Sequence, residues 1–171
     1  DLAAFDREVG TLASLTHPNI LSLYGVSERE AAASGGGQQQ LMVMEYCGGG
    51  DLAAYHVLGV FGKVEYARVV QEMLDAVLYC HQRGMAHRDL KPDNVLLEAG
   101  SRRVKVADFG LAKGDSSGAA TLGVGTPAYM PPELFDEGTI IANLNLFAID
   151  IYSLGVIIWQ LWFKATPYGG G

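Results

Sequence analysis

Apolar residues recur with a helical period in two stretches of this chain. Near the start they are Leu2, Phe5, Val9, Leu12 and Leu15. This pattern predicts a helix that ends before His17-Pro18, because the residue ahead of a proline resists helical angles. A second face, which we expect to be a core pillar, comprises Tyr66, Val69, Val70, Met73, Leu74, Val77 and Leu78. Gly84 is the expected C-cap of that helix.

Short apolar runs between polar segments predict strands. Ile20–Val26 reads as one strand, and Leu41–Tyr46 as a second, buried strand. Between them, the low-complexity stretch 28–40 is expected to be a surface loop. Val95–Leu97 and Val104–Ala107 predict two further strands.

The longest apolar stretch runs from Ile140 to Phe163. A membrane span here would place Asp150 near the bilayer centre, which costs about 2.5–3.5 kcal/mol on the insertion scale. The better interpretation is a buried helix that begins near Asp150. We therefore expect no membrane span in this chain.

Composition narrows the functional classes. The formal net charge is −7 and no basic stripe is present, so we expect no nucleic-acid partner. Cys47 and Cys80 lie far apart without ligand spacing and read as reduced thiols of a cytoplasmic protein.

Two polar motifs carry the candidate chemistry. His87-Arg88-Asp89-Leu90-Lys91-Pro92-Asp93-Asn94 places an acid, a cation and an amide in one loop, and Val104-Lys105-Val106-Ala107-Asp108-Phe109-Gly110 ends in a second acid. Phosphoryl transfer requires these groups: a carboxylate for the hydroxyl proton, a cation for the moving phosphoryl group, and oxygens for Mg²⁺. The alternative is a polar surface turn followed by a buried strand.

Both motifs, in this order, resemble the eukaryotic protein kinase family. The resemblance implies that Asp89 is the catalytic base and that Asn94 and Asp108 bind Mg²⁺. Lys91 resembles the serine/threonine class, in which it contacts the γ-phosphate. ATP, Mg²⁺ and a protein substrate with serine or threonine are the implied ligands.

The resemblance also implies a nucleotide site. Glu8 would be the glutamate of the mobile small-lobe helix that pairs with a strand lysine, although alone it would read as a solvated charge. Glu45 and Cys47 would offer backbone groups to adenine, with Met44 behind the pocket and Leu96 among the nucleotide contacts. Asp51 would reach the ribose, and capping a helix at Leu52 is compatible with that role. Gly48-Gly49-Gly50 alone could equally be a flexible linker.

Regulatory and structural roles follow from the same resemblance. Arg88 would pair with a phosphorylated activation segment, in which Thr121 lies nearest the usual position. Thr126 would contact Asp89 and Lys91. His87 would stack with Phe109, Leu12 and Leu23. Asp150 would bond backbone amides of the catalytic loop, or simply cap its helix.

Some features depart from the family pattern. Pro131-Pro132-Glu133 stands where Ala-Pro-Glu is usual. The run 137–148 is longer and more apolar than expected, and 139–146 within it reads as an insertion or a mis-spliced segment. No Gly-x-Gly-x-x-Gly and no strand lysine precede Glu8. We therefore expect a fragment of a longer kinase or a truncated product.

The predicted fold is α+β: a two-lobed kinase-like domain over 1–171, incomplete at both ends. Residues 1–44 would be the remainder of the small lobe, 45–50 the hinge, and 51–171 the first part of the large lobe. The function hypothesis is a protein serine/threonine kinase. The alternative is a catalytically inactive pseudokinase or docking module.

Overall fold

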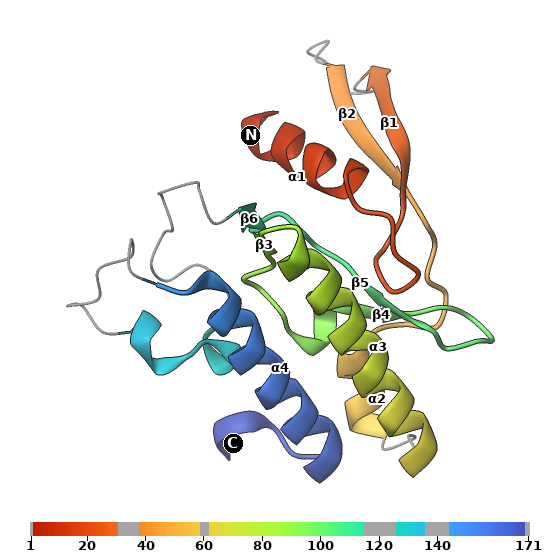
Figure 1. Ribbon diagram of the computed structural model, residues 1–171. Coiled ribbons are helices and arrows are strands. Elements are labelled where there is room, and N and C mark those ends of the chain that lie inside the picture. The colour runs from red at the N-terminus through yellow and green to blue at the C-terminus, as the bar shows by residue number, and fades with distance from the viewer. Residues whose placement is uncertain (1, 31–37, 59–61, 115–125, 136–143, 170–171) are drawn as a thin grey trace.

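The computed structural model describes residues 2–30, 38–58, 62–114, 126–135 and 144–169 (Figure 1). The helices are α1 Leu2–Ala13, α2 Leu52–Leu58, α3 Lys63–Gln82 and α4 Leu146–Phe163. The strands are β1 Leu23–Glu30, β2 Gln38–Met44, β3 Met85–Ala86, β4 Val95–Leu97, β5 Val104–Val106 and β6 Lys113–Gly114. Four 3₁₀ turns complete the described elements: η1 Pro92–Asn94, η2 Pro127–Tyr129, η3 Pro132–Leu134 and η5 Pro167–Gly169.

Three antiparallel strand pairs form among these elements: β1 with β2, β3 with β6, and β4 with β5. In Figure 1, α1 and the β1–β2 hairpin lie at one end of the molecule, and α2, α3 and α4 lie at the other. The chain between Met44 and Asp51 passes from the first group to the second. This arrangement agrees with the expected α+β class.

The strand boundaries at β1 and β2 differ from the prediction. The first strand begins at Leu23, and Ile20 makes only an isolated parallel bridge to Val106. The prediction of a loop over 28–40 was wrong at both ends of that range, because Glu28–Glu30 pairs with Gln38–Gln40 in the β1–β2 hairpin. Residues 31–37 lie outside the described part of the chain. Cross-strand pairing outweighed the weak strand preference of these polar residues.

The expectation of a buried second strand was also wrong. Val43 is 47% exposed, Met44 38% and Leu41 36%. Among the described residues, β2 pairs only with β1, and this two-stranded sheet covers little of its own surface.

The predicted pillar helix is confirmed as α3. Its residues Val69, Met73 and Val77 are buried, whereas Leu74 and Leu78, which we assigned to the same face, are exposed. The helix ends at Gln82, and Gly84 follows with φ +70°, where its N–H bonds the carbonyl of His81. The C-cap is Arg83, one residue before the predicted Gly84, and Gly84 occupies the left-handed position that follows the cap.

Helix α4 begins four residues earlier than predicted. The Asn145 side chain accepts hydrogen bonds from the N–H groups of Phe147 and Ala148, so Asn145 is the N-cap and Asp150 is not. Within the described residues, α4 is the one helix long and apolar enough to cross a membrane, and 39% of it is buried. Core helices of soluble proteins pass the same test, so this is weak evidence. The helix buries Ile149, Leu154, Ile157 and Leu161 in the protein.

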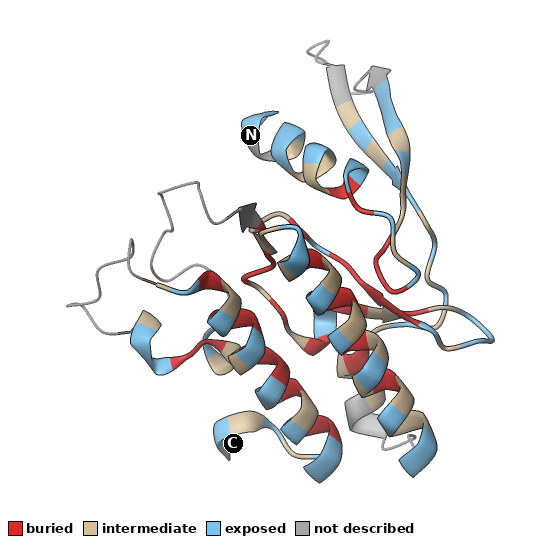
Figure 2. Cartoon of the chain, in the orientation of Figure 1, coloured by how far each residue is buried: buried red, intermediate tan, exposed pale blue. Residues whose placement is uncertain are grey.

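The core lies where α3, α4 and the β4–β5 hairpin meet, as the buried residues in Figure 2 show. Its most buried members include Leu52, Val69, Met73, Val95, Leu97, Val104, Phe109 and Ile157. Burial of this apolar surface supplies the main stabilising free energy.

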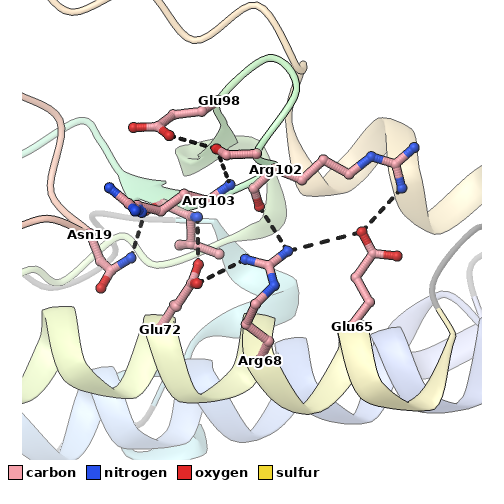
Figure 3. A network of polar contacts seen from close by, with 9 residues as sticks. Asn19, Glu65, Arg68, Glu72, Glu98, Arg102 and Arg103 are labelled. Carbon is pink, nitrogen blue, oxygen red and sulfur yellow. Dashed lines mark hydrogen bonds and ion pairs between the residues drawn. The ribbon is translucent and has the colours of Figure 1, made fainter.

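A polar network fixes the β4–β5 hairpin to α3 and to the loop after α1 (Figure 3). Glu72 Oε2 accepts from the Val104 N–H at 2.7 Å, and Asn19 Nδ2 donates to the Val104 carbonyl at 3.1 Å. Arg68 links Glu72 to the Arg102 carbonyl. The N–H and the carbonyl of Val104, the first residue of β5, are therefore both hydrogen-bonded, which fixes the start of the strand that leads to Asp108.

Candidate active site

Pairing of β4 with β5 brings the two predicted motifs together. Val95 lies opposite Val106 at the end of the strand pair. Just beyond this pair, the Ala107 N–H donates to the Asn94 carbonyl at 2.9 Å. Asn94 ends the loop that carries Asp89, and Asp108 follows Ala107. The loops that hold the two acids therefore meet at one end of this hairpin.

Asp89 lies at the centre of the polar contacts in this loop. Its Oδ1 accepts from the Thr126 N–H at 3.0 Å and from the Thr126 hydroxyl at 3.2 Å. Asn94 Nδ2 donates to the Asp89 carbonyl at 2.9 Å and lies 3.4 Å from Asp89 Oδ2. These contacts orient the carboxylate.

The Lys91 ammonium lies between Asp89 and Thr126. Its Nζ is 3.2 Å from Asp89 Oδ2 and donates to Thr126 Oγ1 at 3.0 Å. The expected contacts of Thr126 with both residues are confirmed. A cation beside a carboxylate is the pair that a phosphoryl transfer needs, since one group neutralises charge and the other takes a proton.

Asn94 and Asp108 have suitable donors for a hard cation. Because Asn94 Nδ2 is used by Asp89, the amide oxygen of Asn94 is the group left for a ligand. Asp108 has an exposed side chain and a positive φ of 60°, a strained angle for a non-glycine residue that is common at functional sites.

A second carboxylate faces Asp108. A Cβ at Gly110 would lie 3.3 Å from Asp108 Oδ1 and 3.7 Å from Glu8 Oε2, so both side chains flank this glycine. Burial, and then the charge of Asp108, raise the pKa of Glu8. A cation bound here would offset the repulsion that Glu8 experiences from Asp108.

His87 supports the loop with its neutral ring. Its Nε2 lies 2.9 Å from the Ala107 carbonyl, and the Asp89 N–H donates to its Nδ1 at 3.3 Å. Nε2 must therefore carry the proton and Nδ1 must be unprotonated. The ring packs on Phe109 with centroids 4.8 Å apart. Leu12 and Phe109 belong to one large buried cluster, and Leu23 packs against that cluster. The His87–Phe109 contact is confirmed, and the stack of His87 with Leu12 and Leu23 stays a prediction.

Asp150, on α4, holds the backbone of the loop 87–94 through hydrogen bonds. It is 1% exposed, and its oxygens accept from the His87 N–H at 2.8 Å and the Arg88 N–H at 2.7 Å. The predicted contact with backbone amides is confirmed. Arg88 has φ 72°, so these bonds stabilise a left-handed conformation that a non-glycine residue rarely adopts.

Sequence reasoning missed the third partner of Asp150. His81, at the end of α3, places Nε2 2.7 Å from Asp150 Oδ2 and packs on Phe147. A single histidine on a helix has no distinctive spacing. Only the crossing of α3 and α4 brings it to the carboxylate.

Arg88 carries a buried guanidinium with spare donor capacity. The residue is 8% exposed, and its Nε has no hydrogen-bond partner among the described residues. Burial lowers the pKa of Arg88, although the charge of Asp150 opposes this. The predicted phosphate-binding role remains a prediction, since Thr121 lies outside the described residues.

One residue of the predicted hinge, Glu45, belongs to an ion cluster around the buried Lys105 that the sequence did not reveal. Lys105 Nζ lies 2.8 Å from Glu45 Oε1, 2.9 Å from Glu45 Oε2 and 3.3 Å from Glu98 Oε1. Burial lowers the pKa of Lys105, but Glu45 and then Glu98 outweigh it and raise the pKa overall. Glu45 also accepts from the Ser22 N–H, so its side chain joins the segment before β1 to β5.

The other residues predicted to contact the nucleotide lie within this hinge or next to it. Cys47 is half-buried, and burial raises the pKa of its thiol. A Cβ at Gly49 would lie 2.6 Å from the Leu97 carbonyl, so this glycine permits close approach to β4 and is not a loose linker. Asp51 bridges Leu96 through its backbone, and its Oδ1 caps α2 by accepting from the Ala54 N–H at 2.8 Å. The cap is confirmed, and contacts with a nucleotide stay predictions.

Comparisons with known proteins agree with this geometry. Residues 2–171 match the protein kinase domain. The chain is 37% identical over 169 residues to CBL-interacting protein kinase 1 of Oryza sativa subsp. japonica, covering 95% of this chain and 34% of that protein. It is 36% identical over 163 residues to CBL-interacting serine/threonine-protein kinase 21 of Arabidopsis thaliana, covering 95% of this chain and 36% of that protein. The chain thus spans about a third of the length of these relatives. The resemblance inferred from the two motifs is confirmed, and this chain belongs to the protein kinase family.

Proposed function

We propose that the protein containing this chain transfers the γ-phosphate of ATP to serine or threonine hydroxyls of a protein substrate. The observation that carries the proposal is the contact of Asp89 with both Lys91 and Thr126. The two relatives named above are called protein kinases, and one is called a serine/threonine-protein kinase.

In this proposal Asp89 accepts the proton of the attacking hydroxyl. Its Oδ1 accepts from Thr126, which orients the carboxylate, and its Oδ2 lies 3.2 Å from the Lys91 ammonium. Lys91 stabilises the negative charge that develops on the phosphoryl oxygens. Asp108 and the Asn94 amide oxygen would hold Mg²⁺, which supplies charge neutralisation of the phosphates when bound.

Adenine is proposed to bind at the hinge, residues 45–50, between a small-lobe part at 1–44 and a large-lobe part at 51–171. Glu45 and Cys47 would present backbone groups, with Leu96 and Asp51 on the large-lobe side. The Lys105–Glu45 ion pair supports this assignment because it immobilises the first hinge residue. Arg88 is the proposed docking point for a phosphate on the activation segment, with Thr121 as the predicted acceptor.

The alternative, an inactive pseudokinase, has one observation in its favour. In the described part of the chain Glu8 forms no ion pair with a lysine or arginine, and its carboxylate faces Asp108 instead. Coding sequence upstream of Asp1 discriminates the two functions. A glycine-rich loop followed by a strand lysine favours the kinase, and their replacement by unrelated residues favours the pseudokinase.

Transfer of labelled γ-phosphate to a histone by the full-length product is the direct test. Asp89→Asn should lower the rate on the order of 10²-fold or more, because the general base is lost. Asp75→Asn serves as the matched control, because it changes a carboxylate on α3 whose hydrogen bond, within the described residues, comes from Gln71. Transfer that persists in Asp89→Asn at the rate of the unaltered protein would disprove the role of Asp89.

A further inference from the structure

The turn between β4 and β5 carries a hydrogen-bonded pair of side chains. Residues 99–101 form its exposed tip. The Ser101 hydroxyl donates to Glu98 Oε2 at 2.6 Å, and the same hydroxyl oxygen accepts from the Arg103 N–H at 3.1 Å (Figure 3). Ser101 therefore orients the Glu98 side chain from the surface of the protein.

The other carboxylate oxygen of Glu98 contacts the buried lysine of β5. Glu98 Oε1 lies 3.3 Å from Lys105 Nζ, and Lys105 is 6% exposed. Lys105 Nζ in turn lies 2.8 Å from Glu45 Oε1 in the predicted hinge. The Ser101 hydroxyl first, and then Lys105, lower the pKa of Glu98 against the effect of burial. One carboxylate thus links an exposed serine to the cation that contacts Glu45.

The end of β4 and the start of this turn also contact the glycines of the hinge. The Gly49 N–H donates to the Leu97 carbonyl at 2.9 Å, and the Leu97 N–H donates to the Gly50 carbonyl at 2.8 Å. A Cβ added at Gly49 would lie 2.8 Å from the Glu98 carbonyl. The two segments lie against each other, so a shift of the turn displaces the hinge.

The charges of the same cluster act on a second hinge residue, Cys47. Burial raises the pKa of the Cys47 thiol. Glu45 raises it further, Lys105 lowers it, and Glu98 raises it. Glu45 and Cys47 are the two residues that we expect to offer backbone groups to adenine. Glu98 therefore acts on both of them, on Cys47 through its charge and on Glu45 through Lys105.

We infer that Glu98, oriented by Ser101, is a positioning residue for the nucleotide at the hinge. The inference rests on the proposed function, in which adenine binds at residues 45–50. A hinge that is fixed before binding loses less conformational freedom when the nucleotide arrives, so each contact that fixes it strengthens binding. The β4–β5 turn is thus a point on the surface from which nucleotide affinity is changed.

Three substitutions of Ser101 in the full-length product test these contacts, with the affinity for ADP and Mg²⁺ measured by equilibrium titration. Ser101→Thr keeps the hydroxyl and should leave the Kd for ADP unchanged. Ser101→Ala deletes the donor to Glu98. We expect the Kd to rise about twofold, the lower end of the range for an ordinary hydrogen bond, because Ser101 is exposed. Ser101→Asp places a second carboxylate beside Glu98 and should raise the Kd further, because like charges repel.

Glu98→Ala removes the link between the turn and Lys105. It should raise the Kd for ADP by a factor of about 2 to 12. Adding Ser101→Ala to it should have no further effect, because both changes remove one shared interaction. Ser14→Ala is the matched control: it deletes another exposed serine hydroxyl, which donates to the Thr11 carbonyl at 2.7 Å outside the turn and the hinge. It should leave the Kd unchanged.

Ser101→Asp separates positioning from a merely structural role of the hydroxyl. The new carboxylate can still accept from the Arg103 N–H, as the serine oxygen does. A hydroxyl that only stabilises the turn therefore predicts a Kd close to that of the unaltered protein. That result overturns the inference, and so does an equal Kd for ADP in all the variants.

Two measurements distinguish this inference from the proposed function. ADP titration requires no phosphoryl transfer, so the expected order of Kd values supports the inference even if transfer to a histone is never detected. Hydrogen exchange without nucleotide reports on the hinge, because the Glu45 and Gly49 N–H groups donate at 2.9 Å to the carbonyls of Ser22 and Leu97. Glu98→Ala should accelerate their exchange. Unchanged exchange, or no ADP binding by the unaltered protein, overturns the inference.

Discussion

Replacement of Asp150 by asparagine should destabilise the fold and distort the loop 87–94. The carboxylate is 1% exposed and accepts three hydrogen bonds, from His87 N, Arg88 N and His81 Nε2. Asparagine keeps one oxygen, which can still serve Arg88. Its NH₂ group then faces His81 and the His87 N–H. The His81 ring can accept a hydrogen bond from this group in its other tautomer, but the His87 N–H is itself a donor and loses its partner.

The cost can be estimated from that count. One hydrogen bond to a charged acceptor is lost and one buried N–H is left without a partner, which together cost about 3 kcal/mol. For a chain of this size that lowers the Tm by about 6 to 12 °C. The strained φ of Arg88 should relax once the hydrogen bonds from the loop backbone to residue 150 are weakened. Any phosphoryl transfer should therefore also decrease.

Urea unfolding and a thermal melt measure the stability, with Asp75→Asn as the control. Asp75 bonds Gln71 on the surface of α3, so its change should stay within about 0.5 kcal/mol. An Asp150→Asn protein as stable as the control would refute the reasoning, since it would mean that the three contacts contribute no net free energy.

Two further predictions concern ionisable groups. Burial and Asp108 raise the pKa of Glu8 above its ordinary 4.5, so the stabilising effect of the shift is present below pH 4.5 and is lost as pH rises through the folded-state pKa. Glu8→Gln should therefore raise the Tm at pH 7 in the absence of nucleotide, and a lower Tm would contradict this. Burial chiefly, and Asp150 next, raise the pKa of Cys80 to about 12. Iodoacetamide at pH 8 should label Cys80 on the order of 10³-fold more slowly than in urea, as mass spectrometry can show, and fast labelling of the folded protein would refute the burial argument.

The candidate site at 87–94 could be predicted because its polar groups are contiguous in the sequence. Asp89, Lys91 and Asn94 lie within six residues, so covalent connection alone keeps them close. His81 and Lys105 could not be predicted in this way. Each is a single residue without a spacing signal, and its partner lies 69 positions away for His81 and 60 for Lys105.

Local sequence patterns were sufficient to predict the local elements and the loops that carry chemistry, because helical periodicity, glycine angles and neighbouring residues act over a few positions. The exposure of β2 and the partners of Asp150 could be known only from the three-dimensional arrangement. Those features depend on which surfaces meet across the molecule. Burial and the pairing of a buried charge are set by atoms distant in sequence, and a local pattern contains no record of them.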